Sequence, residues 1–213
     1  MNSYGAPHKG LRNALSQLSL LAGKTDHTSS AEIIKLYTLG KTVFLLLTTH
    51  AHDEDEVTLA ELEKKMPGAA EADRADHDVI HEKQERLENL LEEIMNGKAD
   101  QGEKFYILFN DFHALYLEHM AREEKETQQL LWDNFTDEEL AGHRAMIMQK
   151  LAPPVLQLWL QFIIPALSHP ERTGFLKGFR ANAPEPFYLD TMSKLQSHVQ
   201  ADEWQKLQNA LNS

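Results

Sequence analysis

The sequence predicts an all-α protein, in which an antiparallel up-down four-helix bundle precedes a C-terminal subdomain of short helices. Apolar residues recur at helical spacing in four long segments, the pattern of amphipathic helices. From the second segment onward the connections are short, which favours antiparallel neighbours. Beyond residue 134 the helical segments become shorter. We therefore expect residues 1–134 to form the bundle and residues 135–213 to form a helical extension packed on it.

Each expected bundle helix is bounded by residues that cap or break a helix. Gly23 and Gly97 end the first and third helices, and Pro67-Gly68 ends the second. A serine at position 29 or 30 is a natural N-cap for the second helix. The expected helices span about residues 7–23, 31–66, 69–96 and 101–134.

The C-terminal part begins with a capping box, in which Glu139 lies three residues after Thr136. The helix that this box opens ends before Pro153-Pro154. An apolar piece follows over residues 155–167, and short helices are expected to begin near residues 170, 184 or 186, and 201. We expect the histidines of this part at the surface: His143, His169 and His198.

Composition excludes several classes of function. The net charge of -12 and the pI near 5.3 argue against a nucleic-acid partner or an anionic membrane surface, because both need a clustered basic face. The absence of cysteine excludes disulfides, zinc-thiolate and iron-sulfur sites, and cysteine nucleophiles. No stretch approaches the roughly 20 apolar residues of a membrane span, and the N-terminus lacks the apolar region of a signal peptide. We expect a cytoplasmic protein.

Three pairs of candidate metal ligands recur along the chain with four-residue spacing. They are His50 with Glu54, His77 with His81, and His119 with Glu123. Residues i and i+4 differ by about 40° around a helix, so both members of a pair point the same way. The acidic run over residues 50–57, taken alone, would be a solvated face. Its recurrence on three helices favours a metal site.

Counting from the turns places these pairs at one height. The pair on the third helix lies 16 and 20 residues before Gly97, and the pair on the fourth lies 18 and 22 residues after Gln101. At about 1.5 Å per residue the two pairs are level, and His8 on the first helix reaches the same region. Imidazole and carboxylate ligands together suit iron, zinc or manganese, and two carboxylates among five histidines can bridge two ions.

The order of these residues resembles the hemerythrin-like (HHE cation-binding) family. The matching strings are HKGLRNAL, HAHDEDEV, DHDVIHE and EHMAREE, and the resemblance covers roughly residues 5–134. It implies a bundle that holds a non-haem di-iron centre with five histidines and two bridging carboxylates. The ligands that it implies are His8, His50, Glu54, His77, His81, His119 and Glu123. In hemerythrin itself the last carboxylate stands one position later, which would select Glu124 instead of Glu123.

Three hypotheses about function follow. The first is a metal-binding protein, non-catalytic or weakly catalytic, whose two non-haem iron ions bind or sense dioxygen, nitric oxide or iron itself; zinc or manganese are the alternative metals. The second is a di-iron oxidoreductase acting on peroxide or nitric oxide. The third is a helical interaction module with a vestigial metal site. The expected partners are a small diatomic ligand and an unidentified protein that contacts the C-terminal helices, which have no counterpart in the oxygen-carrying members of the family.

Two other groups of residues are expected to stay outside the site. His52 with Glu56 has the same spacing but points about 160° away from His50, so it is an exposed echo of the pair. Three tyrosines on helix faces could place a hydroxyl near a bound ligand, but packing in the core is their expected role. They are Tyr37, Tyr106 and Tyr116.

Overall fold

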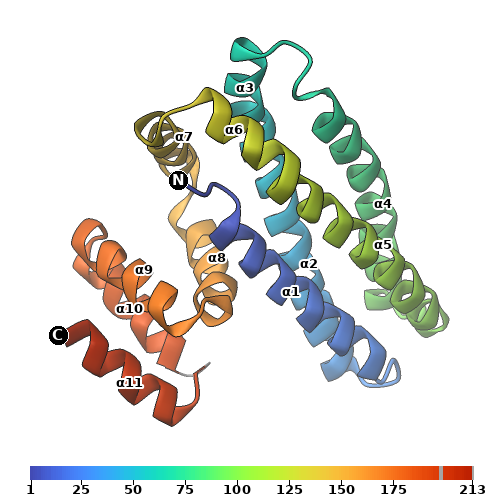
Figure 1. Cartoon of the computed structure of the whole chain (residues 1–213). Coiled ribbons are helices and arrows are strands. Elements are labelled where there is room, and N and C mark those ends of the chain that lie inside the picture. The colour runs from blue at the N-terminus through green and yellow to red at the C-terminus, as the bar shows by residue number, and fades with distance from the viewer. Residues whose placement is uncertain (197–198, 213) are drawn as a thin grey trace.

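The structure, a computed structural model that describes residues 1–196 and 199–212, confirms the all-α fold. Its described residues form helices and no strand. Four antiparallel rods make the bundle (Figure 1). The first rod is α1 (Gly5–Lys24), the second joins α2 (Ser30–Asp53), η1 (Glu54–Thr58) and α3 (Leu59–Lys65), the third is α4 (Glu71–Met95), and the fourth joins α5 (Gly102–Arg122), η3 (Glu123–Thr127) and α6 (Gln128–Asn134).

The turns between rods lie at the expected helix breakers. Gly68 and Gly97 have φ angles of +88° and +95°, a conformation that glycine adopts without a steric penalty. A short 3-10 turn, η2 (Ala99–Gln101), leads from the second of these turns into α5. Because the connections are short, the second, third and fourth rods are antiparallel neighbours.

Aromatic rings fill the bundle on one side of the candidate ligands. Phe44 of α2 packs against Phe109 and Phe112 of α5, with ring centroids 6.4 and 6.5 Å apart. Ring contacts continue along α5 from Phe112 to Tyr116, at 5.8 Å, and from Tyr116 to His119, at 5.7 Å. The candidate ligands therefore adjoin a dry apolar layer.

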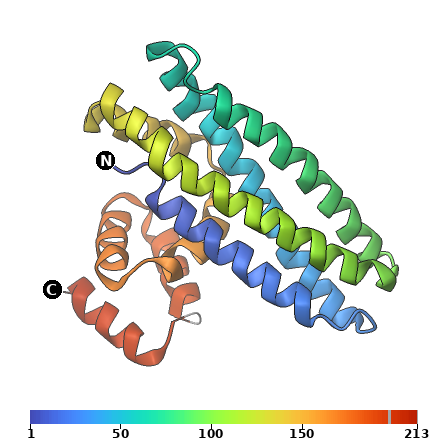
Figure 2. The same cartoon turned by 45° about the vertical axis from the view of Figure 1, so that its right-hand side comes forward.

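Five helices follow the bundle, and α8 links them to it (Figures 1 and 2). They are α7 (Asp137–Lys150), α8 (Pro153–Ala166), α9 (His169–Asn182), α10 (Glu185–Gln196) and α11 (Ala201–Asn212). Along α1, Asn13 Nδ2 donates to the carbonyl of Phe162, and Trp159 and Ile163 belong to the bundle core. Leu160, on another face of α8, packs in a second core with residues of α9, α10 and α11. Where the chain divides into units stays a prediction, but α8 contributes to both cores.

Several expectations for the C-terminal part can be compared with the structure. The capping box at Thr136 and Glu139 is confirmed. His169 is exposed as expected, but the expectation for His143 is wrong, because its ring is buried edge-on against Phe135 with centroids 4.9 Å apart. His198 lies outside the described residues. Within the described ranges, no helix is both long and apolar enough to cross a membrane.

Candidate metal centre

Two π-helical turns interrupt the second and fourth rods, and each begins at a candidate glutamate. The Leu59 amide donates to the Glu54 carbonyl and the Gln128 amide to the Glu123 carbonyl, each across five residues. The apolar Leu62 comes eight residues after Glu54 and would lie about 80° around a regular α-helix; the extra residue of the π turn reduces this to about 20°. Each π turn thus lets one face of its rod carry candidate metal ligands at the start of the turn and apolar side chains after it.

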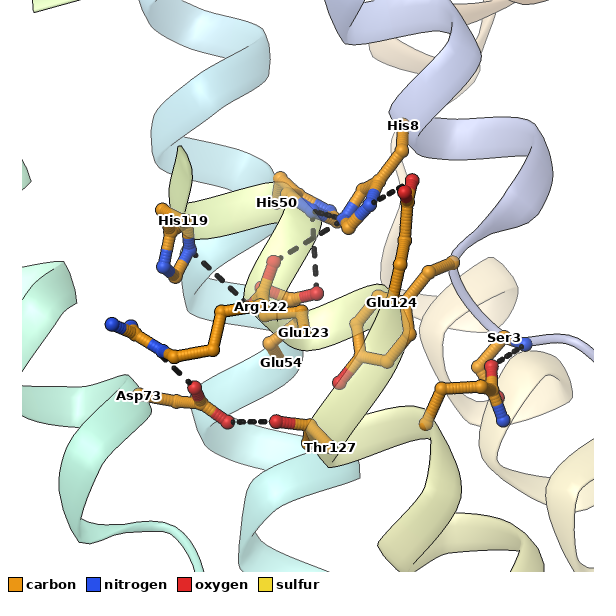
Figure 3. Close-up of polar contacts among 12 residues, drawn as sticks. Ser3, His8, His50, Glu54, Asp73, His119, Arg122, Glu123, Glu124 and Thr127 are labelled. Atoms are coloured by element: carbon orange, nitrogen blue, oxygen red, sulfur yellow. Dashed lines mark hydrogen bonds and ion pairs between the residues drawn. The ribbon is translucent and has the colours of Figure 1, made fainter. Parts of the chain in front are cut away.

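Six buried side chains from α1 and the other three rods converge beside these turns (Figure 3 shows five of them). They are His8, His50, Glu54, His77, His119 and Glu123, none of them more than 6% exposed. Their ligand atoms form two groups of four, and within each group all atoms lie within 4.8 Å of one another. The groups are His8, His50, Glu54 and Glu123, and Glu54, His77, His119 and Glu123. Both glutamates are thus shared.

The two oxygens of each glutamate face different histidines. Glu54 Oε1 lies 3.2 Å from His50 Nε2, and Glu54 Oε2 lies 3.4 Å from His77 Nε2. Glu123 Oε2 lies 3.4 Å from His8 Nε2, and Glu123 Oε1 lies 3.2 Å from His119 Nε2. Each carboxylate therefore lies between a histidine of one donor group and a histidine of the other.

The donor atoms fit metal ions better than they fit one another. Both oxygens of Glu54 and of Glu123, with Nε2 of His77 and of His119, are buried without a hydrogen-bond partner in the described part of the chain. Such groups cost several kcal/mol each when they stay unpaired. Ligands about 2.1 Å from one ion are separated by about 3.0 to 3.4 Å, the spacing seen between most neighbouring donors here.

Comparison with known proteins agrees with this geometry. The model of the hemerythrin HHE cation-binding domain matches residues 5–131. The chain belongs to this family. It is therefore a metal-binding, hemerythrin-like protein, and the buried cluster of histidines and glutamates is its candidate metal centre.

One related protein matches most of the length of this chain. It is a zinc finger protein, BRUTUS-like, from Arabidopsis thaliana, 24% identical over 185 residues. These residues are 85% of this hemerythrin-like chain but 15% of the plant protein, so the chain spans a small part of that relative's length. No solved structure matches the chain.

Carboxylates outside the cluster hold three of the four histidines by Nδ1. His8 Nδ1 lies 3.0 Å from Glu124 Oε1, His77 Nδ1 lies 3.1 Å from Asp55 Oδ1, and His119 Nδ1 lies 3.4 Å from Asp76 Oδ2. Because a carboxylate accepts the Nδ1 proton, Nε2 is the nitrogen left to face a metal ion. The sequence reasoning did not predict this role for the three acids and considered Glu124 only as an alternative to Glu123, although each acid stands directly beside a candidate ligand in the chain.

The fourth histidine has an aromatic neighbour from outside the bundle. Trp159 of α8 packs edge-on against His50, with ring centroids 6.0 Å apart and planes at 65°. His50 Nε2 lies 3.0 Å from His8 Nε2. Trp159 thus brings the C-terminal helices to the wall of the hemerythrin-like metal centre.

The structure does not bring His81 to the cluster. Its side chain is 65% exposed and lies 3.4 Å from Glu85, one turn further along α4. The buried face of α4 runs through His77, Ile80 and Gln84. This face is centred on the side of His77 away from His81, which lies about 80° from its middle. The expectation of five histidines is therefore corrected to four.

Glu123, and not Glu124, lies in the buried cluster of candidate ligands. Glu123 is fully buried in both groups of donor atoms. Glu124 lies outside them, where Arg12 donates to both of its oxygens at 2.6 and 3.0 Å. The side chains of His52 and Glu56 are exposed, as expected.

Contacts among these side chains shift their pKa values. Burial alone would lower the pKa of His8, but contacts with Glu123 and Glu124 raise it to about 9. Burial likewise opposes the charge of His77, but Asp55, Glu123 and Glu54 raise its pKa to about 12. For Glu123, the neighbouring His77 and His8 outweigh burial and hold the pKa well below its usual value.

The other members of the cluster favour their neutral forms. Burial and the charge of Glu123 raise the pKa of Glu54. Burial and the nearby His8 hold the pKa of His50 well below its usual value. A buried cluster that carried two carboxylates without protons or metal would be strongly unfavourable. The raised pKa values of His8, His77 and Glu54 keep protons on these three side chains, and a bound metal ion would replace those protons.

Proposed function

We propose that this protein holds a non-haem di-iron centre that binds or senses a small ligand, dioxygen or nitric oxide, or senses iron itself. His8 and His50 would hold one ion, His77 and His119 the other, and both glutamates would bridge them. The observation that carries the proposal is the pair of four-atom donor groups sharing Glu54 and Glu123.

The donor chemistry supports iron. A set of imidazoles and carboxylates without thiolate suits iron, zinc or manganese, and iron adds reversible redox change and affinity for diatomic ligands. Four protein donors leave open positions on a six-coordinate ion. The histidines and glutamates themselves fix where the ions sit, and the neighbouring phenylalanine layer excludes water.

The burial of the site supports a small ligand. None of the six side chains is more than 6% exposed, so an organic substrate would not reach them without movement of the rods. Dioxygen, nitric oxide and peroxide are small enough to enter. An oxidoreductase acting on peroxide or nitric oxide would use the same donors. It would differ from a binding protein in consuming its ligand over repeated turnovers.

The first experiment compares two histidines on one helix. Metal content per chain is measured by mass spectrometry for the wild type, His77→Ala and His81→Ala, each purified aerobically without chelator. We expect about two irons in the wild type and in His81→Ala, and a loss of at least one in His77→Ala. Equal metal content in all three would contradict the assignment of His77 as a ligand.

Further outcomes separate the three functions. No metal in the wild type, even after anaerobic addition of iron, would leave the interaction module with a vestigial site. For loaded protein, titration with dioxygen and nitric oxide in the presence of a reductant follows. Saturation near one ligand per centre supports binding or sensing, whereas sustained consumption of peroxide or nitric oxide supports the oxidoreductase.

A further inference from the structure

Tyr4 lies beside the candidate metal centre and carries a buried hydroxyl that the sequence reasoning did not consider. The side chain is 2% exposed, and its hydroxyl is buried without a hydrogen-bond partner among the residues the structure describes. Its ring packs against His8, one turn later in the chain, with centroids 4.9 Å apart and planes at 35°. A buried, unpaired phenol is unusual, because tyrosine hydroxyls in protein interiors normally find an acceptor.

The charged groups that face Tyr4 come from three other elements. Burial, followed by the charges of Glu54, Glu123 and Asp73, raises the pKa of Tyr4 well above its usual value, so the phenol keeps its proton. Asp73 already accepts a 2.6 Å hydrogen bond from Thr127 Oγ1. The oxygens of Glu54 and Glu123 face histidine nitrogens. None of the described residues accepts a hydrogen bond from the Tyr4 hydroxyl, which leaves the hydroxyl free to donate one to a bound ligand.

The N-terminal segment holds this phenol in place. Asn2 Oδ1 accepts hydrogen bonds from the amides of Tyr4 and Gly5, at 3.0 and 2.8 Å. The next contact is long-range, from the Ser3 amide to Gln128 Oε1 at 2.7 Å, directly after the second π turn (Figure 3). A donor fixed in this way can meet a ligand without paying much ordering entropy.

We propose that the Tyr4 hydroxyl donates a hydrogen bond to a small anionic or oxygen-containing ligand bound beside the bridging glutamates. The inference rests on the proposed di-iron function, which supplies the ion that holds such a ligand. Tyr4 then selects ligands that accept a hydrogen bond over ligands of the same size that do not.

The test uses azide as the probe and Tyr4→Phe as the variant. Azide is titrated into the iron(III)-loaded full-length protein and followed by its absorption band. We expect Tyr4→Phe to keep the wild-type iron content and to bind azide about tenfold more weakly, the effect of one hydrogen bond to a charged group. Tyr37→Phe is the control: Tyr37 donates to Glu92 at 2.8 Å, about 20 Å along α2 from His50, and its loss should leave azide affinity unchanged.

A second measurement needs no metal. Since the Tyr4 hydroxyl has no hydrogen-bond partner among the described residues, Tyr4→Phe should leave the thermal midpoint of protein stripped of metal unchanged or raise it, whereas Tyr37→Phe should lower it. Unchanged azide affinity in Tyr4→Phe, or a midpoint lowered more than in Tyr37→Phe, would overturn the assignment of Tyr4 alone. Failure of the wild type to hold iron would overturn the di-iron function and the Tyr4 proposal together.

Discussion

Metal loading should release protons, because the nitrogens that face the metal positions carry them in the metal-free protein. His8 Nε2 lies 3.4 Å from Glu123, and His77 Nε2 lies 3.4 Å from Glu54. The pKa values of the two imidazoles are raised to about 9 and about 12 by these and neighbouring carboxylates. Both are therefore protonated at pH 7, and a metal ion must displace both protons.

The size of the effect follows from the count. A third proton comes from the Glu54 carboxyl, whose pKa burial and Glu123 raise to about 8. Three protons released on filling both positions make the combined affinity rise about 1000-fold per pH unit between pH 6 and 7, or about 4.1 kcal/mol per unit. The stability of the metal-free protein should instead fall as pH rises. The folded-state pKa values of His8 and His77 lie above the unfolded value of about 6.5, so their contribution to stability is complete below that pH and declines as pH rises toward 9 and beyond.

Calorimetry can count these protons directly. Zinc(II), a redox-silent probe, is titrated into metal-free protein in two buffers of different ionisation enthalpy at pH 7, and affinity is measured with a metal indicator at pH 6.5 and 7.5. His81→Ala should release as many protons as the wild type, because His81 lies outside the donor groups. Release of less than about one proton per chain would refute the reasoning, since it would show that His8 and His77 are neutral before loading.

Two further predictions test the packing of α8 on the bundle. A Cβ at Gly10 would lie 2.6 Å from Ile163 Cγ1 and 3.3 Å from the Ile163 backbone. Such overpacking costs about 1 to 3 kcal/mol, which outweighs the gain of about 1 kcal/mol in helix propensity. We therefore expect Gly10→Ala to lower the free energy of unfolding measured in urea. Gly178→Ala, where nothing lies within 4 Å, should raise it by up to about 1 kcal/mol, and equal gains at both glycines would rule out the close contact. Trp159→Ala should lower the free energy of unfolding by about 3 to 5 kcal/mol. The iron content should stay unchanged, because Trp159 packs on His50 without being a ligand. A decrease of less than about 1 kcal/mol would place α8 outside the core.

Local signals in the sequence were sufficient for the rods and their ends. Gly97 and Pro67-Gly68 end helices for reasons that involve only their own backbone, and the structure has turns at both places. The pairs His50 with Glu54 and His119 with Glu123 follow equally from helix geometry. These features depend on residues a few positions apart, which is the range over which sequence patterns are informative.

Features that depend on packing between rods could not be predicted from local sequence patterns. The pair His77 and His81 has the spacing of the other two, yet only His77 is buried, because the face of α4 that meets the core is set by its neighbours. The π turns at Glu54 and Glu123 have no sequence signature of their own. The apolar residues 155–167 were recognised, but their spacing does not say that they cover α1.

The acids around the cluster connect a buried site to water. Glu124, Asp55 and Asp76 are each about a third exposed, at 32, 37 and 33%, while the imidazoles that they contact are almost fully buried. Each of these rings therefore spans the wall of the centre, with Nε2 toward the metal positions and Nδ1 toward a solvated carboxylate.

His50 is the exception, because among the described residues no acid contacts its Nδ1, and its ring packs edge-on against Trp159. The two metal positions consequently differ in surroundings, although their donor sets are alike. Both histidines of one position, His77 and His119, are held by acids. In the other position only His8 is held in this way, and its second histidine contacts the helix that joins the bundle to α9, α10 and α11.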